Sequence, residues 1–89
     1  MNRRTYYFSG HVQGVGFRYT ARHAANGRQV TGYVRNLDDG RVEMVMEGAD
    51  GEMDAVLEGI RAELGHNISR TTVDAGPATG EFNAFGIRH

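Results

Sequence analysis

The sequence predicts an α+β fold in which an antiparallel sheet is covered on one face by two helices. Helix-like segments alternate with strand-like segments, an Asp-Gly pair marks a tight hairpin, and no cysteine is present to form disulfides. At 39% hydrophobic and 24% charged residues, the composition is that of a soluble globular protein. We expect residues 1–89 to form a single domain.

The first two elements are a strand and a helix joined by a glycine-rich turn. Tyr6 to His11 begins with aromatic residues, which favour a strand. The following helix is predicted from apolar residues at helical spacing, namely Phe17, Ala21, Ala24 and Ala25. Gly27 is a suitable end for this helix.

The next two strands form a hairpin. Val30 to Asn36 alternates between two faces, as a strand does. Asp38-Asp39-Gly40 predicts the turn, because Asp-Gly accepts the positive φ angles that tight hairpins require. A third strand is predicted from Val42, Met44 and Met46, which alternate with Arg41, Glu43 and Glu47.

The second helix is the clearest element. One apolar stripe is formed by Met53, Val56, Leu57, Ile60 and Leu64. Asp50 is the expected N-cap and Gly65 the expected stop. A fourth strand is predicted at Ile68 to Asp74, ended by Gly76-Pro77, and a last extended segment at Glu81 to Arg88.

This βαββαβ order is the split arrangement of ferredoxin-like folds. There the first two strands run parallel with another strand between them, joined by a right-handed helical crossover. Their C-terminal ends therefore lie at one edge of the sheet. The glycine turn follows one of these ends and Asn36 follows the other, so we expect the two features to face each other.

The glycine turn has the composition of an anion site. Gly10, Gly14 and Gly16 let backbone N–H groups converge, and Arg18 adds a planar charged fork that fits phosphate oxygens. A helix that begins near Arg18 would favour the same anion. An ordinary strand-to-helix turn with a solvent-facing arginine explains these residues equally well.

Asn36 adds a group that can hold a water molecule. Together with an anion cradle and Arg18, it could aim that water at phosphorus, which suits a substrate with a good leaving group such as the carboxylate of an acyl phosphate. Taken alone, Asn36 is explained more simply as a turn residue before the Asp-Gly hairpin.

Composition excludes several other functions. All ten basic residues are arginine, so a Walker-type P-loop and Schiff-base chemistry are excluded. A net charge of −1 speaks against a general nucleic-acid partner. No signal or membrane-spanning segment is evident, which favours the cytoplasm. None of the four histidines, His11, His23, His66 and His89, has metal-ligand spacing to another.

Two segments resemble the acylphosphatases. Gly10-His11-Val12-Gln13-Gly14-Val15-Gly16-Phe17-Arg18 is similar to the first signature of that family. Gly32-Tyr33-Val34-Arg35-Asn36-Leu37-Asp38-Asp39-Gly40-Arg41-Val42-Glu43, with Gly48 following, is similar to the second. The two motifs occur in the right order and spacing, and the similarity extends over nearly the whole chain.

The resemblance implies a ferredoxin-like enzyme that hydrolyses the carboxyl-phosphate bond of small acyl phosphates without metal or cofactor. By position it makes Arg18 the phosphate-binding arginine and Asn36 the residue that orients water. The phosphate cradle would be the backbone N–H groups of Gln13, Gly14, Val15, Gly16, Phe17 and Arg18. We expect a cytoplasmic monomer whose partner is a small acyl phosphate, not a nucleic acid or a membrane.

Two departures from the family pattern bear on the structure. Asn26-Gly27-Arg28-Gln29 replaces what is commonly a leucine-glycine helix end, so we expect the first helix to stop early or bend. His89 stands where a tyrosine is common and is expected to alter the contacts of the chain end near the site.

Two alternatives remain on the same fold. RNA-recognition domains stack bases on aromatic residues of their central strands, which Tyr6, Tyr7 and Phe8 could imitate. The third strand argues against this, because it has no aromatic residue and two acids. The other alternative is a carbamoyl-phosphate-handling domain like those of hydrogenase-maturation proteins. The absence of zinc-binding cysteines favours a free-standing enzyme.

Overall fold

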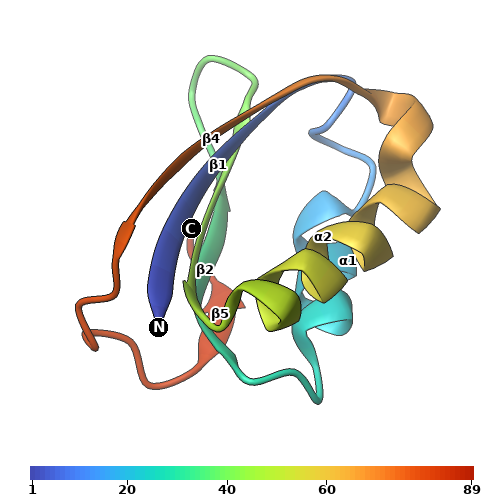
Figure 1. Cartoon of the computed structure of the whole chain (residues 1–89). Helices are drawn as coiled ribbons and strands as arrows, with labels where there is room; N and C mark the ends of the chain where they lie inside the picture. Colours follow the sequence, from blue (N-terminus) through green and yellow to red (C-terminus); the bar gives the residue numbers. More distant parts are fainter.

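The computed structural model describes all of residues 1–89 and shows two layers, a five-stranded sheet with two helices on one face (Figure 1). The elements in chain order are β1 (Asn2–Gly10), α1 (Phe17–Ala25), β2 (Val30–Asn36), β3 (Val42–Gly48), α2 (Asp50–Leu64), the 3-10 helix η1 (Gly65–Asn67), β4 (Ile68–Pro77) and β5 (Phe85–Ile87). None of the helices is both long and apolar enough to cross a membrane.

The strand order confirms the predicted ferredoxin-like α+β fold. The sheet runs β4-β1-β3-β2-β5, with β3 antiparallel to both of its neighbours and β5 parallel to β2. β1 and β2 are therefore parallel with β3 between them, as the sequence predicted. Their C-terminal ends lie at the same edge of the sheet.

The strand boundaries differ from those predicted. β1 begins at Asn2 rather than near Tyr6, because its first residues pair with β3 on one side and β4 on the other. β4 continues through Gly76-Pro77, where Pro77 pairs with Asn2 at the end of an edge strand and needs no further donor. The last extended segment is shorter than predicted, since only Phe85–Ile87 pairs with β2.

The ends of α2 also differ from the prediction. Ala49, not Asp50, is the N-cap residue, and no side chain caps the helix. The Asp50 carboxylate instead accepts a hydrogen bond from Asn2 and lies 3.3 Å from the Arg4 guanidinium. Gly65 keeps right-handed helical angles, so the chain tightens into η1 rather than stopping there.

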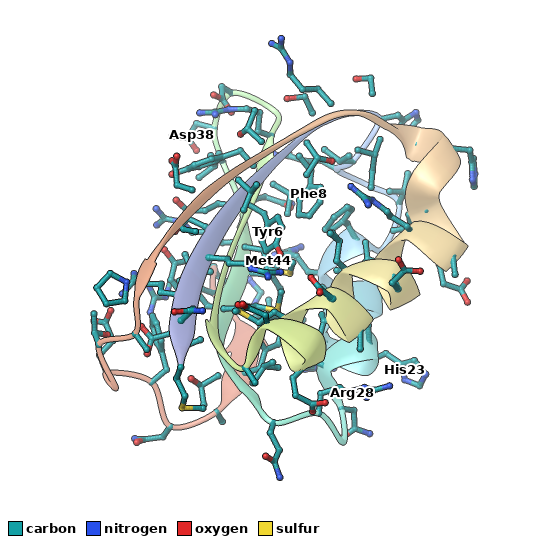
Figure 2. The ribbon with its side chains drawn as sticks, in the orientation of Figure 1. Tyr6, Phe8, His23, Arg28, Asp38 and Met44 are labelled. Atoms are coloured by element: carbon teal, nitrogen blue, oxygen red, sulfur yellow. The ribbon has the colours of Figure 1, made fainter.

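The core lies between the sheet and the helices, and it fixes both ends of the glycine turn. Figure 2 shows Tyr6, Phe8 and Met44 in this layer. Phe17, the first residue of α1, packs its ring 4.8 Å from that of Phe8. Val12, at the other side of the turn, is fully buried. Two buried anchors therefore hold the segment between them at the edge of the sheet.

Side chains also cover the centre of the sheet face that is opposite the helices. β3 is buried on both faces, and Glu43 and Glu47 on the helix-free face are only 7% and 3% exposed. Glu43 accepts hydrogen bonds from both Tyr7 and Tyr33, and from the Arg35 guanidinium. Neighbouring side chains therefore cover this face of β3.

Glu47 is held by the loop that precedes β5. Its carboxylate accepts hydrogen bonds from the backbone N–H and hydroxyl of Thr79 and from the backbone N–H of Gly80. These bonds satisfy a buried charge, which would otherwise be costly. Glu47 therefore fastens the loop between β4 and β5 to the centre of the sheet.

Candidate active site

The glycine turn between β1 and α1 lies at the same end of the sheet as the β2–β3 hairpin (Figure 1). Gly14 and Gly16 have φ angles of 76° and 78°, which favour glycine, whereas Val15 between them does not. When the φ angle alternates in sign from one residue to the next, successive main-chain N–H groups point to one side, and this geometry binds anions. The local sequence therefore explains the concave turn.

The N–H groups of this turn are free to bind a ligand. Of the six donors from Gln13 to Arg18, none is bonded to another group of the protein. The first helical bond of α1 comes later, from Thr20 N–H to the Gly16 carbonyl at 3.0 Å. The free donors therefore lie at the positive end of the helix dipole, where an anion is stabilised.

A glutamine side chain joins this turn to the hairpin that carries Asn36. Gln13 Nε2 donates to the carbonyl oxygens of Leu37 at 2.7 Å and Arg41 at 3.0 Å. Leu37 directly follows Asn36, the last residue of β2. The structure thus brings the turn and the end of β2 together, as the topology predicted. The Asn36 amide itself makes no hydrogen bond within the protein.

Arg18 is the second residue of α1 and keeps its charge uncompensated. It forms no ion pair, and its only polar side-chain contact is with His89, whose Nδ1 lies 3.3 Å from Nη1. By contrast, Arg35 pairs with Glu43 and Arg41 pairs with Asp39, each at 2.8 Å. His89 therefore does contact a candidate site residue.

The turn lies on the open surface. None of the four hollows in the molecule is lined by a residue of the turn, and the nearest in sequence begins at Tyr19. A site of this kind can bind a small group such as phosphate through backbone donors, but it does not enclose a large ligand.

The two acidic residues of the β2–β3 hairpin, Asp38 and Asp39, are explained without ligand binding. The Asp39 carboxylate accepts hydrogen bonds from the backbone N–H and guanidinium of Arg41, so it stabilises the hairpin. Asp38 is exposed on that hairpin, as Figure 2 shows. The structure contains no group of three histidine, aspartate or glutamate side chains arranged to hold a metal ion.

The aromatic residues of β1 do not form a base-stacking platform. Tyr6 and Phe8 face the helices and are 2% and 0% exposed. Only Tyr7 lies on the other face, where its hydroxyl donates to Glu43 and its ring lies under Arg41. The RNA-binding alternative therefore loses two of the three rings on which it rested.

Sequence reasoning missed the role of the Gln13 side chain, since it assigned Gln13 only a backbone donor. The one available signal was a polar side chain directly before the glycines. That signal does not indicate which carbonyl groups would lie within reach, because Leu37 and Arg41 are more than twenty residues away.

Comparison with known proteins relates the chain to one family. A sequence model of the acylphosphatase family matches residues 4–87. An acylphosphatase of Acaryochloris marina is 42% identical over 80 residues, covering 89% of this chain and 85% of the relative. One from Yersinia pseudotuberculosis is 40% identical over 85 residues, covering 93% of this chain and 91% of the relative. Another from Haloarcula marismortui is 54% identical over 52 residues, covering 58% of this chain and 57% of the relative.

Solved structures agree with the sequence matches. The crystal structure of acylphosphatase from Bacillus subtilis superimposes with a TM-score of 0.90 at 30% identity and covers all of both chains. The crystal structure of T. kodakarensis HypF gives a TM-score of 0.82 at 29% identity, covering 99% of this chain and 12% of that one.

Together with the fold, these likenesses define a small ferredoxin-like hydrolase of acyl phosphates. The match spans nearly the full length and includes both the glycine turn and the segment that ends in Asn36. The chain belongs to the acylphosphatase family.

Proposed function

We propose that Arg18 and the backbone donors of residues 13–18 bind the phosphate of an acyl phosphate, and that Asn36 orients the water that attacks it. The observation that supports this most strongly is the set of six free N–H groups beside an unpaired arginine. Gln13 fastens this set to the hairpin that follows Asn36. Family membership supports the acyl phosphate as substrate.

The proposed reaction needs little acid or base chemistry. A water held by the Asn36 amide oxygen attacks phosphorus as the bond from phosphorus to the acyl oxygen breaks. The carboxylate leaves with the bonding electron pair, and the proton lost by the water passes to phosphate or solvent. The cradle and Arg18 stabilise the charge on the three oxygens that do not react. A carboxylate leaves readily without being protonated.

The test is hydrolysis of benzoyl phosphate in EDTA. Wild type is expected to be active, because the proposed groups supply binding and orientation themselves. Arg18→Ala should raise KM and lower kcat by roughly a hundred-fold or more, as loss of a transition-state charge donor does. Asn36→Ala should lower kcat with little change in KM, because it acts on the water.

Matched controls separate a local effect from a general one. Arg61→Ala and Asn83→Ala remove the same side-chain types from exposed positions outside the turn and the hairpin. Both should retain wild-type kinetics. Full activity of Arg18→Ala, or an equal loss in Arg61→Ala, would overturn the proposal.

We further propose that the chain acts as one catalytic domain and as a cytoplasmic monomer, without metal, nucleic acid or membrane. The large exposed apolar residues, Met1, Tyr19 and Val73, are scattered along the chain, which supports a monomer. The absence of cysteine is compatible with a reducing compartment. Light scattering on a size-exclusion column tests the oligomeric state, and a dimer mass would contradict it.

A further inference from the structure

His89 lies beside the proposed phosphate site, although it is far from the glycine turn in the sequence. Its imidazole Nδ1 is 3.3 Å from Nη1 of Arg18, and the Arg18 side chain makes no other polar contact within the protein. A guanidinium can only donate hydrogen bonds, so the imidazole nitrogen that faces it must be the acceptor. The imidazole of this contact is therefore the neutral form, with its proton on Nε2.

The register of the sheet explains why His89 lies there. β5 pairs with β2 in parallel, with Val34 opposite Ile87, and the Arg88 N–H continues the pairing by donating to the Val34 carbonyl at 2.9 Å. Asn36 and His89 each follow two residues later, on the face that carries the core and α1, because side chains alternate along an extended chain. His89 is therefore at the same end of the sheet as Asn36 and the glycine turn.

The charged groups around the His89 imidazole favour a bound anion. Arg18 contacts it from α1, and no acidic side chain forms an ion pair with it. Arg22 lies one turn further along α1 and forms no ion pair either. Arg35 of β2 and Arg88 are on the other face of the sheet, where each lies over an aromatic ring. A proton on the imidazole would therefore meet a like charge and no carboxylate until an anion binds beside Arg18.

We propose that His89 is a second cationic ligand of the reacting phosphate and takes up a proton when the anion binds beside Arg18. This inference rests on the proposed function and adds a phosphate-binding residue to it. Histidine side chains change their charge between pH 5 and 8, so solvent can supply the proton. A bound dianion offsets the repulsion between the imidazolium and the Arg18 guanidinium, and both imidazole nitrogens then donate. Because binding and protonation are linked, each strengthens the other by the same factor.

Calorimetric titration with sulfate at pH 5.5 and at pH 8.0 tests this inference. Sulfate is a tetrahedral dianion at both values, whereas phosphate itself changes charge between them. The Kd of wild type should be roughly three- to five-fold lower at pH 5.5, because an exposed ion pair contributes up to about five-fold. In His89→Gln, which keeps a side-chain acceptor but takes up no proton, the two Kd values should be equal. Titrations at pH 6.5 in buffers of different ionisation enthalpy should show proton uptake by wild type and none by His89→Gln.

His11→Gln is the matched control, because His11 is also exposed and also adjoins the glycine turn. Its N–H donates to the Asn67 carbonyl at 3.0 Å, next to β4 at the opposite edge of the sheet from β5. This variant should keep the pH dependence and the proton uptake of wild type.

The outcomes separate the two proposals. Failure of sulfate to bind wild type at both pH values would refute the proposed phosphate site, and the inference with it. Binding with equal Kd at the two pH values would refute only the inference. So would a pH dependence that persists in His89→Gln, or one that His11→Gln abolishes equally.

Discussion

Gln13 connects the two halves of the site through a single side-chain nitrogen. Its Nε2 bonds two carbonyl groups of the hairpin, while its backbone N–H belongs to the proposed cradle. In the proposed mechanism, this side chain positions the phosphate and the attacking water relative to each other. Displacements of about 1 Å can lower rates by a hundred-fold when reacting groups must be aligned.

Gln13→Leu is expected to lower kcat by roughly ten- to a hundred-fold with a smaller change in KM. The leucine keeps most of the side-chain volume but cannot donate to the Leu37 and Arg41 carbonyls. The free energy of unfolding should fall by only about 1 kcal/mol, the usual net contribution of hydrogen bonds. Steady-state kinetics and urea unfolding measure the two effects separately.

Gln29→Leu is the matched control, because Gln29 is exposed and its side chain makes no hydrogen bond. It should leave both kcat and stability unchanged. A Gln13→Leu protein with wild-type kcat would show that the loop and the hairpin need no such connection.

At the residue scale, the sequence predicted those features that depend only on neighbouring residues in the chain. Three glycines followed by an arginine predicted a concave turn, and the structure shows positive φ angles at Gly14 and Gly16. The side-chain bonds of Gln13 and the burial of Glu43 were not predicted. Both depend on which distant groups the fold brings together, which composition and periodicity do not specify.

At the element scale, β2 and β3 approach too closely for a side chain at Gly32. Gly32 has a φ angle of 138°, and a Cβ there would lie 1.8 Å from the Val45 carbonyl oxygen. Gly32→Ala should therefore lower the free energy of unfolding by roughly 3 kcal/mol or more, through backbone strain and overpacking. Chemical denaturation measures this loss.

Gly51→Ala in α2 provides the contrast. Its Cβ would meet nothing within 4 Å, and alanine is a better helix former, so stability should rise by up to about 1 kcal/mol. Equal stability of the two alanine variants would contradict the close strand approach.

Element types were predictable and their ends were not. The apolar stripe of α2 identified that helix because five large residues share one spacing. Its N-cap was predicted wrongly at Asp50, since tertiary partners Asn2 and Arg4 engage that carboxylate. The Gly76-Pro77 pair was likewise expected to end β4, but pairing with β1 extends the strand to the proline. Tertiary contacts decided each of these cases.

At the scale of the whole molecule, the helix-free face depends on buried glutamates. Burial by itself would raise the pKa of Glu43, but hydrogen bonds from Tyr33, Tyr7 and Arg35 outweigh it, and the pKa lies below its ordinary value. Burial would also raise the pKa of Glu47, but hydrogen bonds from Thr79 and Gly80 outweigh it, so this pKa is lowered as well. These carboxylates connect β1, β2, β3 and the loop before β5.

This arrangement predicts a loss of stability in acid. A carboxyl group whose pKa is lower in the folded state binds its proton more readily when unfolded. The ionised group therefore contributes fully to the free energy of unfolding above the ordinary glutamate pKa of about 4.3. This contribution declines as the pH falls through the lowered pKa of the folded state. Glu43→Gln should cost about 1.5–3 kcal/mol at pH 7, because it removes hydrogen bonds to a charged acceptor.

Urea unfolding at pH 7 and at pH 3 measures the effect. The difference between wild type and Glu43→Gln should shrink at the lower pH. Glu58→Gln, which alters an exposed glutamate, should follow wild type at both values. A gap between wild type and Glu43→Gln that stays constant with pH would show that the charge of Glu43 is not what stabilises this face.

Titration with inorganic phosphate tests most directly whether the turn between β1 and α1 binds a tetrahedral oxyanion. In ¹H–¹⁵N spectra, the amide signals of residues 13–18 should shift in a saturable manner. The shifts should be lost in Arg18→Ala and retained in Arg61→Ala. If the signals of these six amides do not shift at a high phosphate concentration while the protein remains folded, the turn does not bind the anion and the proposed site is wrong.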